Sequence, residues 1–505
     1  MFNDQPKGLY TLALANTGER FGYYTMIAVF VLFLKSNFNL DPALAGGVYS
    51  TFLMLVYLMP LVGGALADRF GYGKMVTLGI VVMFLGYLAL AIPLGSGSVA
   101  IASTLGALLL ISVGTGLFKG NLQVMVGNLY DDPRYESKRD EAFSIFYMAI
   151  NLGALFAPTA AVKVMEYMQS IGVSEADSYH YAFGVACVSL VLSIAVYYVG
   201  RSTFRHVEGA AKKSEAKGNA EEELSAADTR ARMIALCLVF AVVIFFWMAF
   251  QQNGLTLTFF ADEFTARTSS GIESMGFDVT NLVLLIVIVY AAFALFQGKT
   301  AKGRSIAGAI IVACIAGLVW KYMNLPAETK VSAPIFQHFN PCYVVGLTPV
   351  SIALFGWLAR KGKEPSAPRK IALGMLVAAL AYLVLAIGSI GFPSPNEQAK
   401  AVAAGTATFA SPSWLIVTYL IMTFGELLLS PIGLSFVSKV APPKYKGLMM
   451  GGWFVSTAAG NLLVAVGGLL WGSIPLWMVW GVFVVLCLIS ALFMMTIMKR
   501  LEAVC

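Results

Sequence analysis

Charged side chains are scarce in this sequence. Asp, Glu, Lys and Arg make up only 12% of its 505 residues, whereas soluble domains carry about 25%. Hydrophobic residues make up 58% of the chain, and its mean hydropathy is +0.77. This composition excludes an ordinary soluble domain and indicates an integral membrane protein.

Cysteine and histidine are also scarce, with six and three residues. The cysteines form no CxxC motif and most lie in apolar runs, so they indicate neither a disulfide framework nor a metal site. The histidines have no Cys or carboxylate at ligand spacing. The chain also lacks a Walker loop, a dinucleotide fingerprint and a Ser-His-Asp pattern, so ATP-driven transport and enzyme catalysis have no support. We therefore expect no enzyme activity, no metal and no cofactor.

Apolar runs long enough to cross a membrane occur fourteen times. They lie near residues 11–34, 44–67, 75–94, 99–129, 142–165, 181–200, 233–260, 281–297, 306–322, 341–359, 371–391, 413–438, 447–470 and 474–498. Lys and Arg gather in alternate loops between the runs, which predicts cytoplasmic N- and C-termini. The net charge of +7 could also indicate a nucleic-acid partner, but basic residues kept on cytoplasmic loops account for it.

A polar stretch over residues 201–232, rich in Lys, Glu, Ala and Ser, separates the sixth run from the seventh and predicts a cytoplasmic linker. We expect a six-helix bundle on each side, over residues 1–200 and 233–505, with an extra two-helix hairpin near 281–322 inserted in the second. Two pairs of short segments at matching places support this repeat: Gly64–Arg69 with Gly356–Lys361, and Asp132–Tyr135 with Pro442–Tyr445.

The first apolar run contains charged residues that a membrane helix normally avoids. Residues at i, i+3, i+4 and i+7 line one face of this helix. They are Asn16, Glu19, Arg20 and Tyr23. Each charge costs about 2.5–3.5 kcal/mol at a helix centre, so we interpret this face as the lining of a substrate or proton path. The alternative is a helix end where Glu19 and Arg20 lie at the membrane interface.

Two further charges lie deep in apolar runs, Lys119 and Glu426. The alternatives are a snorkelling lysine for Lys119 and a structural helix–helix hydrogen bond for Glu426. Together with Glu19 and Arg20 they give two charges of each sign, a balance that a cavity of low dielectric requires. A buried carboxylate beside a lysine is also a natural proton carrier.

Uncharged polar and aromatic residues complete the candidate binding set. They are Tyr23, Tyr24, Tyr57, Asn151, Trp247, Gln251, Asn340, Trp453 and Ser456. Aromatic residues in membrane helices also serve as packing residues or interface anchors, which is the alternative here.

The chain resembles the proton-dependent oligopeptide transporters (POT family), a branch of the major facilitator superfamily, over essentially its whole length. The resemblance rests on five segments in order: Asn16–Tyr24, Gly64–Arg69, Phe143–Gly153, Phe336–Pro341 and Gly425–Ser435. It implies a major facilitator fold with twelve core helices in two bundles, alternating access, and proton-driven uptake of di- and tripeptides.

The resemblance also implies roles for the candidate residues. Arg20 and Lys119 would contact the carboxyl end of the peptide. Asn151, Asn340 and Glu426 would line the site, and Glu426 would face the amino end. Five aromatic residues would shape side-chain pockets: Tyr23, Tyr24, Tyr57, Trp247 and Trp453. Lys119 and Glu426 would form a salt bridge between the bundles that breaks during the cycle.

The sequence departs from the family pattern at three linked positions. Asn16 stands where the first motif usually has Glu, and Gln251 stands where Glu usually follows Trp247. Ile27 stands where prokaryotic members often place the Arg that pairs with that second Glu. Replacing both partners of a buried ion pair is often neutral, and neither Asn nor Gln titrates. Glu19 and Glu426 remain as carboxylates that could carry a proton, with Lys119 as the third candidate for proton coupling.

We therefore expect a multi-pass transporter of the inner membrane that acts as a monomer on small peptides and protons. The bilayer is its other partner, and we expect no nucleic acid. Two alternatives remain open: a weakly coupled or uncoupled facilitator of peptides or another small substrate, and a non-transporting membrane sensor.

Overall fold

The computed structural model describes residues 5–209, 225–298, 300–442 and 445–503. In these residues it contains fourteen helices long and apolar enough to cross a membrane, which confirms the predicted number. Helices suit the bilayer because they satisfy their backbone donors and acceptors internally. The chain is therefore an almost entirely α-helical, multi-pass membrane protein.

The chain forms two compact units. The described parts of Met1–Gln251 and Val437–Leu469 make up the first unit. Its helices are α1 (Lys7–Phe38), α2 (Pro42–Phe70), α3 (Tyr72–Ala91), α4 (Ser98–Asn128), α5 (Arg139–Ser170), α6 (Glu175–Val199), α7 (Ala226–Phe250) and α16 (Lys446–Leu463). Three short 3₁₀ turns belong to it as well: η1 (Glu136–Lys138), η2 (Arg201–Thr203) and η3 (Arg205–Val207).

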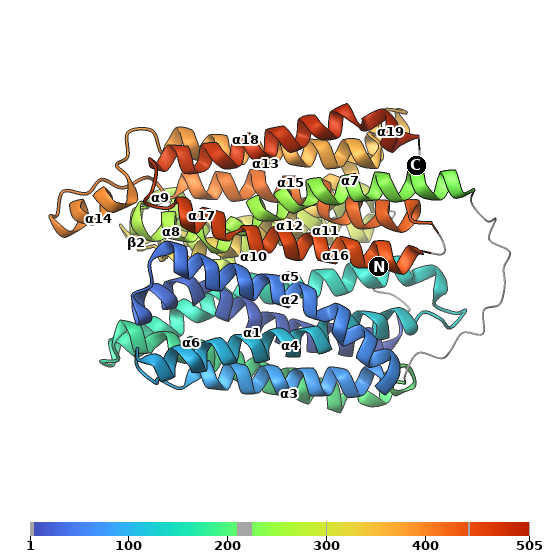
Figure 1. The fold of residues 1–505 in the computed structure, drawn as a ribbon, viewed down its shortest axis with the longest axis horizontal. Helices are drawn as coiled ribbons and strands as arrows, with labels where there is room; N and C mark the ends of the chain where they lie inside the picture. The colour runs from blue at the N-terminus through green and yellow to red at the C-terminus, as the bar shows by residue number, and fades with distance from the viewer. Residues whose placement is uncertain (1–4, 210–224, 299, 443–444, 504–505) are drawn as a thin grey trace. The chain divides into compact units, whose positions relative to one another are not determined.

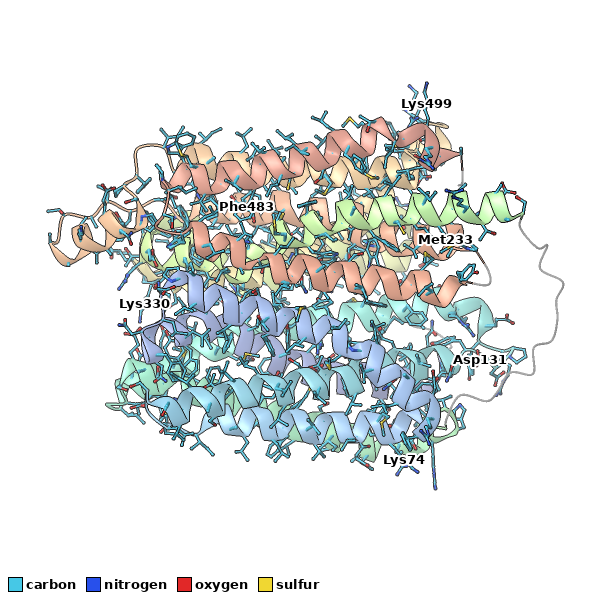
Figure 2. The ribbon with its side chains drawn as sticks, viewed as in Figure 1. Lys74, Asp131, Met233, Lys330, Phe483 and Lys499 are labelled. Atoms are coloured by element: carbon cyan, nitrogen blue, oxygen red, sulfur yellow. The ribbon has the colours of Figure 1, made fainter. Side chains whose placement is uncertain are left out.

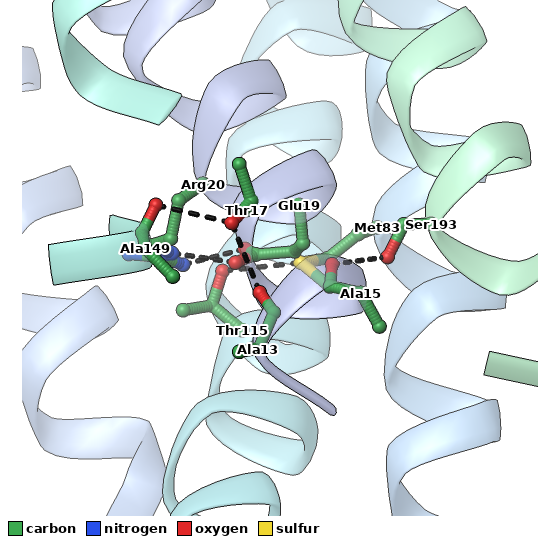
Figure 3. A network of polar contacts seen from close by, with 9 residues as sticks. All are labelled: Ala13, Ala15, Thr17, Glu19, Arg20, Met83, Thr115, Ala149 and Ser193. Carbon is green, nitrogen blue, oxygen red and sulfur yellow. Dashed lines mark hydrogen bonds and ion pairs between the residues drawn. The ribbon is translucent and has the colours of Figure 1, made fainter. Parts of the chain in front are cut away.

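Helix α1 packs between α5 and α6 and is largely buried. Two side-chain hydrogen bonds hold it there: the Ser193 hydroxyl donates to the Ala15 carbonyl at 2.6 Å, and the Thr17 hydroxyl donates to the Ala149 carbonyl at 3.1 Å (Figure 3). Close approach also depends on glycine, since a Cβ on Gly22 would lie 3.2 Å from the carbonyl oxygen of Ala186 on α6. Small residues are the usual means of bringing membrane helices together.

Helices α3 and α4 run side by side in opposite directions (Figure 1). As a result Lys74, near the start of α3, and Asp131, just after α4, lie at the same end of the unit (Figure 2). Helix α2 meets α4 so closely that a Cβ on Gly63 would lie 2.1 Å from the Gly116 carbonyl oxygen.

Helix α16 packs against both α2 and α7 within the first unit. A Cβ on Gly460 would lie 2.5 Å from the carbonyl oxygen of Ile244 on α7, so glycine again permits the contact. The sequence assigns α7 and α16 to the second six-helix bundle by connectivity. The bundle boundaries stay a prediction. Residues 210–224 of the predicted linker lie outside the described residues.

The second unit comprises Gln252–Phe436 and the described residues after Leu469. Its helices are α8 (Thr256–Glu263), α9 (Gly271–Ser274), α10 (Val279–Gln297), α11 (Ala301–Met323), α12 (Phe339–Arg360), α13 (Ala367–Gly388), α14 (Pro395–Ala403), α15 (Ser413–Val440, whose last residues belong to the first unit), α18 (Leu476–Thr496) and α19 (Met498–Glu502). Short elements complete it: η5 (Met275–Phe277), η6 (Ala333–His338), and strands β1 (Thr268–Ser269) and β2 (Thr329–Lys330), which pair antiparallel. Two elements, η4 (Gln251–Gly254) and α17 (Ala465–Leu470), straddle the division.

The aromatic core of the second unit lies between α13 and α18. Tyr382 stacks on Trp480 with ring centres 6.1 Å apart and lies 5.1 Å from the ring of Phe483, which Figure 2 labels. The Trp480 indole donates to the Ser389 hydroxyl at 2.9 Å, which satisfies its N–H in the core.

Helices α10 and α11 form the hairpin expected near residues 281–322. They pack on each other, and α10 also packs on α12, where the Tyr290 hydroxyl donates to the Val345 carbonyl at 3.2 Å. Lys321 ties the open ends together by donating to Asp278 at 2.5 Å and to the Thr280 hydroxyl. Because Ala307 and Cys314 are the buried side chains of α11, this hairpin lies on the outside of its unit.

Candidate functional site

Arg20 and Glu19 form a buried ion pair on α1. The Arg20 Nε and Nη2 atoms donate to the two carboxylate oxygens of Glu19, each at 2.5 Å (Figure 3). The side chains are 3% and 0% exposed. Consecutive residues on a helix normally point away from each other, so both side chains bend back to meet. Pairing neutralises two charges that would each be costly alone in a membrane.

The ring of Tyr23 contacts the guanidinium of Arg20, and two further rings contact Tyr23. The central carbon of the guanidinium lies 4.7 Å from the ring centre of Tyr23, a cation–π distance. Tyr23 meets Tyr24 edge-on at 5.3 Å and stacks with Phe52 of α2 at 6.3 Å. The polar face of α1 is therefore held by rings from α1 and α2.

Lys119 of α4 lies over the ring of Tyr57, with its ammonium nitrogen 4.4 Å from the ring centre. Within the described part of the first unit, its contact is with this ring, and no first-unit carboxylate forms an ion pair with it. A cation resting on a tyrosine face is stabilised by about 0.5–2 kcal/mol, far less than a carboxylate provides in a dry site. Lys119 is therefore suited to exchange this contact for an anion.

Some of the other first-unit candidates already use their polar atoms in hydrogen bonds, and others do not. The Asn151 amide donates to the Tyr147 carbonyl at 3.0 Å, and the Ser456 hydroxyl donates to the Gly452 carbonyl at 2.8 Å. Both side chains donate to a backbone carbonyl on their own helix. In contrast, the indole nitrogen of Trp247 is buried with no hydrogen-bond partner among the described residues, and so is the amide nitrogen of Asn16. Such donors are costly to leave unused, which makes them available to a ligand.

The remaining two candidates lie on or next to the helices α7 and α16. Gln251 caps the C-terminal end of α7, where the chain changes to the 3₁₀ turn η4. Trp453 is buried on α16. Helix breaks in membrane transporters characteristically expose backbone groups near binding sites.

In the second unit, Asn340 and Glu426 contact each other directly. The Asn340 amide donates to a Glu426 carboxylate oxygen at 2.9 Å and to the Thr423 hydroxyl at 3.0 Å. Asn340 is the second residue of α12 and Glu426 lies in the middle of α15, so this contact joins two helices. Glu426 is 9% exposed, and the amide is a neutral partner for its charge.

All the candidate residues except Asn340 and Glu426 belong to the first unit. The structure brings Arg20 together with Glu19 and Tyr23, and Lys119 together with Tyr57. The salt bridge between Lys119 and Glu426 joins residues of different units and stays a prediction. No group of three His, Cys, Asp or Glu side chains that could hold a metal ion occurs among the described residues.

Two residues of the site were not identified from the sequence. Phe52 stacks on Tyr23, and Thr423 accepts a hydrogen bond from Asn340. Thr423 lies three residues before Glu426, so helical spacing could have placed both on one face. The side chain of Phe52 has no polar atom, and nothing in the sequence around it distinguishes it from an ordinary packing residue.

The chain is similar in sequence and structure to known membrane transporters. The model of the POT family matches residues 73–220 and 318–468. The chain is 30% identical to the uncharacterized transporter YclF of Bacillus subtilis, over 95% of this chain and 91% of that one. It is 28% identical to a di-/tripeptide transporter of Lactococcus lactis, over 92% and 89% of the two chains. The crystal structure of a mutant of peptide transporter POT in complex with alafosfalin matches with a TM-score of 0.74 and 26% identity, covering 100% of this chain and 96% of that one.

Proposed function

The chain belongs to the POT family of transporters, and we propose that it imports di- and tripeptides by proton symport with alternating access. The observation that carries this proposal is the buried Arg20, which is held by Glu19 and by the ring of Tyr23. A guanidinium presents two parallel N–H groups that match a carboxylate. The carboxyl end of a peptide is such a group, and it has the same chemistry as the Glu19 side chain that Arg20 holds in this structure.

Competition for Arg20 provides a physical route to proton coupling. When a peptide carboxylate binds the guanidinium, Glu19 loses its ion-pair partner. The Glu19 side chain is fully buried, so water cannot replace that partner. An unpaired buried carboxylate is strongly destabilised, and taking up a proton removes the charge. Peptide binding and protonation of Glu19 would then favour each other. Lys119 would add a second positive charge for the peptide carboxylate after leaving the ring of Tyr57.

Glu426 supplies the opposite charge for the amino end of the peptide. The Asn340 amide donates to the Glu426 carboxylate and also to the Thr423 hydroxyl. A carboxylate with a neutral amide partner keeps its negative charge available to a substrate ammonium or to Lys119. We therefore propose that Glu426 alternates between these cations during the cycle and carries a proton when it has neither.

The aromatic candidates would contact peptide side chains without selecting them tightly. Tyr23, Tyr24, Tyr57, Trp247 and Trp453 present ring faces, and the free indole N–H of Trp247 can donate to a peptide carbonyl. Asn151, Gln251 and Ser456 would complete the binding set. Anchoring the charged ends and the backbone in this way tolerates many side chains.

We also propose an inner-membrane location with both termini in the cytoplasm and function as a monomer with protons as the coupling ion. The clustering of Lys and Arg in alternate loops supports this orientation. Lys74 and the Asp131 region lie at one end of the first unit, where basic loops are expected to face the cytoplasm (Figure 2).

Counterflow in proteoliposomes tests the substrate class. Liposomes loaded with an unlabelled dipeptide should take up the labelled dipeptide, and external dipeptide should compete. The same dipeptide with an amidated carboxyl end should compete at least tenfold less well, because Arg20 and Lys119 then lack their anion. Equal competition by the amidated peptide, or no counterflow with any short peptide, would contradict the proposal.

A further inference from the structure

A groove of about 340 Å³ lies on the first unit, and none of the residues proposed to bind peptide lines it. Its lining residues belong to α2 and α4, both of which Figure 1 labels. The lining residues are Ala43, Leu44, Gly47, Val48, Thr51, Phe52, Leu55, Leu105, Leu108 and Leu109. None of them is charged, and Thr51 is the single residue among them with a polar side chain.

The groove opens toward the surroundings of the unit and has a closed floor. Leu44, Leu105 and Leu109 at its rim are 58%, 49% and 52% exposed. Phe52 and Leu108 at its floor are buried. Both helices are long and apolar enough to cross a membrane, so the exposed leucines of the rim suit the hydrocarbon of a bilayer.

The dimensions of the groove suit a hydrocarbon chain. Its lining runs along α2 from Ala43 to Leu55, a distance of about 18 Å at a rise of about 1.5 Å per residue. It begins at the first turn of α2, next to Asp41, which caps the helix through the Leu44 amide at 2.9 Å. The groove therefore starts near the membrane surface and extends into the apolar layer, as a phospholipid tail does.

The floor of this groove touches the proposed transport site. Phe52 stacks with Tyr23, with ring centres 6.3 Å apart. The central guanidinium carbon of Arg20 lies 4.7 Å from the ring centre of Tyr23. A chain in the groove would press on the outer side of Phe52 and limit its movement away from Tyr23. An empty space beside Phe52 would leave its ring without contacts on that side, which weakens packing.

We propose that one acyl chain of a membrane phospholipid occupies the groove between α2 and α4 and braces Phe52 against Tyr23. Apolar attraction to the bilayer itself gives the chain no preference for the groove, so the preference comes from close packing along the lining. The consequence for transport rests on the proposed function, whereas binding of the lipid does not.

Gly47 offers a direct way to fill the groove. A Cβ on Gly47 would meet no atom within 4 Å, so Gly47→Leu would extend into the groove without a clash at its base. Gly106 on α4 provides a matched control, because it is exposed, also has no atom within 4 Å of a Cβ, and is not part of the lining.

The test compares wild type, Gly47→Leu and Gly106→Leu after identical detergent purification. Native mass spectrometry counts the phospholipids retained, and thermal unfolding is measured before and after delipidation. Wild type and Gly106→Leu should retain one phospholipid that Gly47→Leu lacks, and delipidation should lower their unfolding midpoint more than that of Gly47→Leu. Equal retention and equal midpoint shifts in all three proteins would overturn the proposal.

A second measurement keeps the proposal testable if Gly47→Leu does not fold. Wild-type protein in vesicles that contain a phospholipid with a diazirine on its acyl chain is irradiated, and the adducts are mapped by peptide mass spectrometry. Adducts should concentrate on Leu44–Leu55 and Leu105–Leu109. Labelling spread evenly over exposed membrane residues such as Val188 and Leu192 of α6 would overturn it. Neither readout requires transport, so failure here is distinguishable from failure of the peptide-transport proposal.

Discussion

The guanidinium of Arg20 holds the carboxylate of its sequence neighbour Glu19 through two hydrogen bonds of 2.5 Å inside the first unit. Each side chain therefore satisfies a charge that the membrane interior would otherwise penalise. A peptide carboxylate that binds Arg20 must replace Glu19, so this pair links the substrate to a titratable group.

Removing one member of this pair should cost both stability and uptake. Arg20→Ala leaves Glu19 buried without a partner, a change that costs about 3–5 kcal/mol. We expect a lower thermal unfolding midpoint in detergent and no dipeptide uptake. Arg20→Lys keeps the charge but loses the two-pronged contact, and should raise KM by about ten- to hundredfold, since a hydrogen bond to a charged group contributes about 1.5–3 kcal/mol.

The double variant Glu19→Gln/Arg20→Gln separates the two effects. It removes both charges, so it should unfold at a higher temperature than Arg20→Ala and still show no uptake. Recovery of uptake in the double variant would mean that Arg20 does not anchor the peptide.

Glu426 should matter more for accumulation than for exchange. Glu426→Gln keeps the size of the side chain and can still contact Asn340, but it cannot carry a proton. We expect gradient-driven accumulation of a labelled dipeptide to fall more strongly than counterflow in the same proteoliposomes. Asn340→Ala is the comparison, since it removes the amide donor and leaves the titratable group. An equal loss of both activities in Glu426→Gln would assign that residue to binding alone.

Variants at positions 27 and 251 test whether Ile27 and Gln251 together replace the two partners of one ion pair. Position 27 holds a buried isoleucine in this chain, where the family resemblance implies an arginine. The variant Gln251→Glu should therefore introduce a carboxylate that has no arginine partner. We expect this single variant to lower the unfolding midpoint. The double variant Ile27→Arg/Gln251→Glu should be more stable than the sum of its two single variants predicts, a coupling that a double-mutant cycle measures directly. Strict additivity would show that the two positions do not pair in this chain.

The end of α19 should show a dependence on pH. The Ser366 hydroxyl, at 2.6 Å, and the Arg369 guanidinium, at 2.7 Å, lower the pKa of Glu502. A carboxyl whose pKa is lowered on folding stabilises the protein above its unfolded pKa of about 4.3, and this stabilisation is lost as the pH falls through the lowered value. The unfolding midpoint of Glu502→Gln should therefore lie below that of wild type at pH 7 and approach it in acid. A difference that stays constant down to the lowest pH would contradict this assignment.

The membrane spans could be predicted from the sequence because bilayer thickness fixes the length of an apolar run. The hairpin α10–α11 was found this way even though both of its runs are short. The charged candidates could also be found, since Glu19, Arg20, Lys119 and Glu426 interrupt such runs. Helical spacing predicted that Glu19, Arg20 and Tyr23 share a face of α1, and in the structure Arg20 contacts the other two side chains.

The partners of these charges could not be predicted in the same way. Helical spacing puts Glu19 and Arg20 on the same polar face, but consecutive side chains do not normally face each other, so spacing did not indicate that Arg20 would turn to Glu19. The contacts of Lys119 with Tyr57 and of Asn340 with Glu426 join separate helices, and they depend on how those helices pack. The lipid groove and the role of Phe52 at its floor likewise arise from the packing of α2 against α4.

Accumulation of a labelled dipeptide in proteoliposomes, with and without an inward proton gradient, tests the central claim most directly. We predict uptake above the external concentration when the gradient is imposed, and loss of that accumulation when an ionophore collapses it. Arg20→Ala should show no uptake under either condition. Wild-type uptake that reaches the same level with and without the gradient would contradict proton symport.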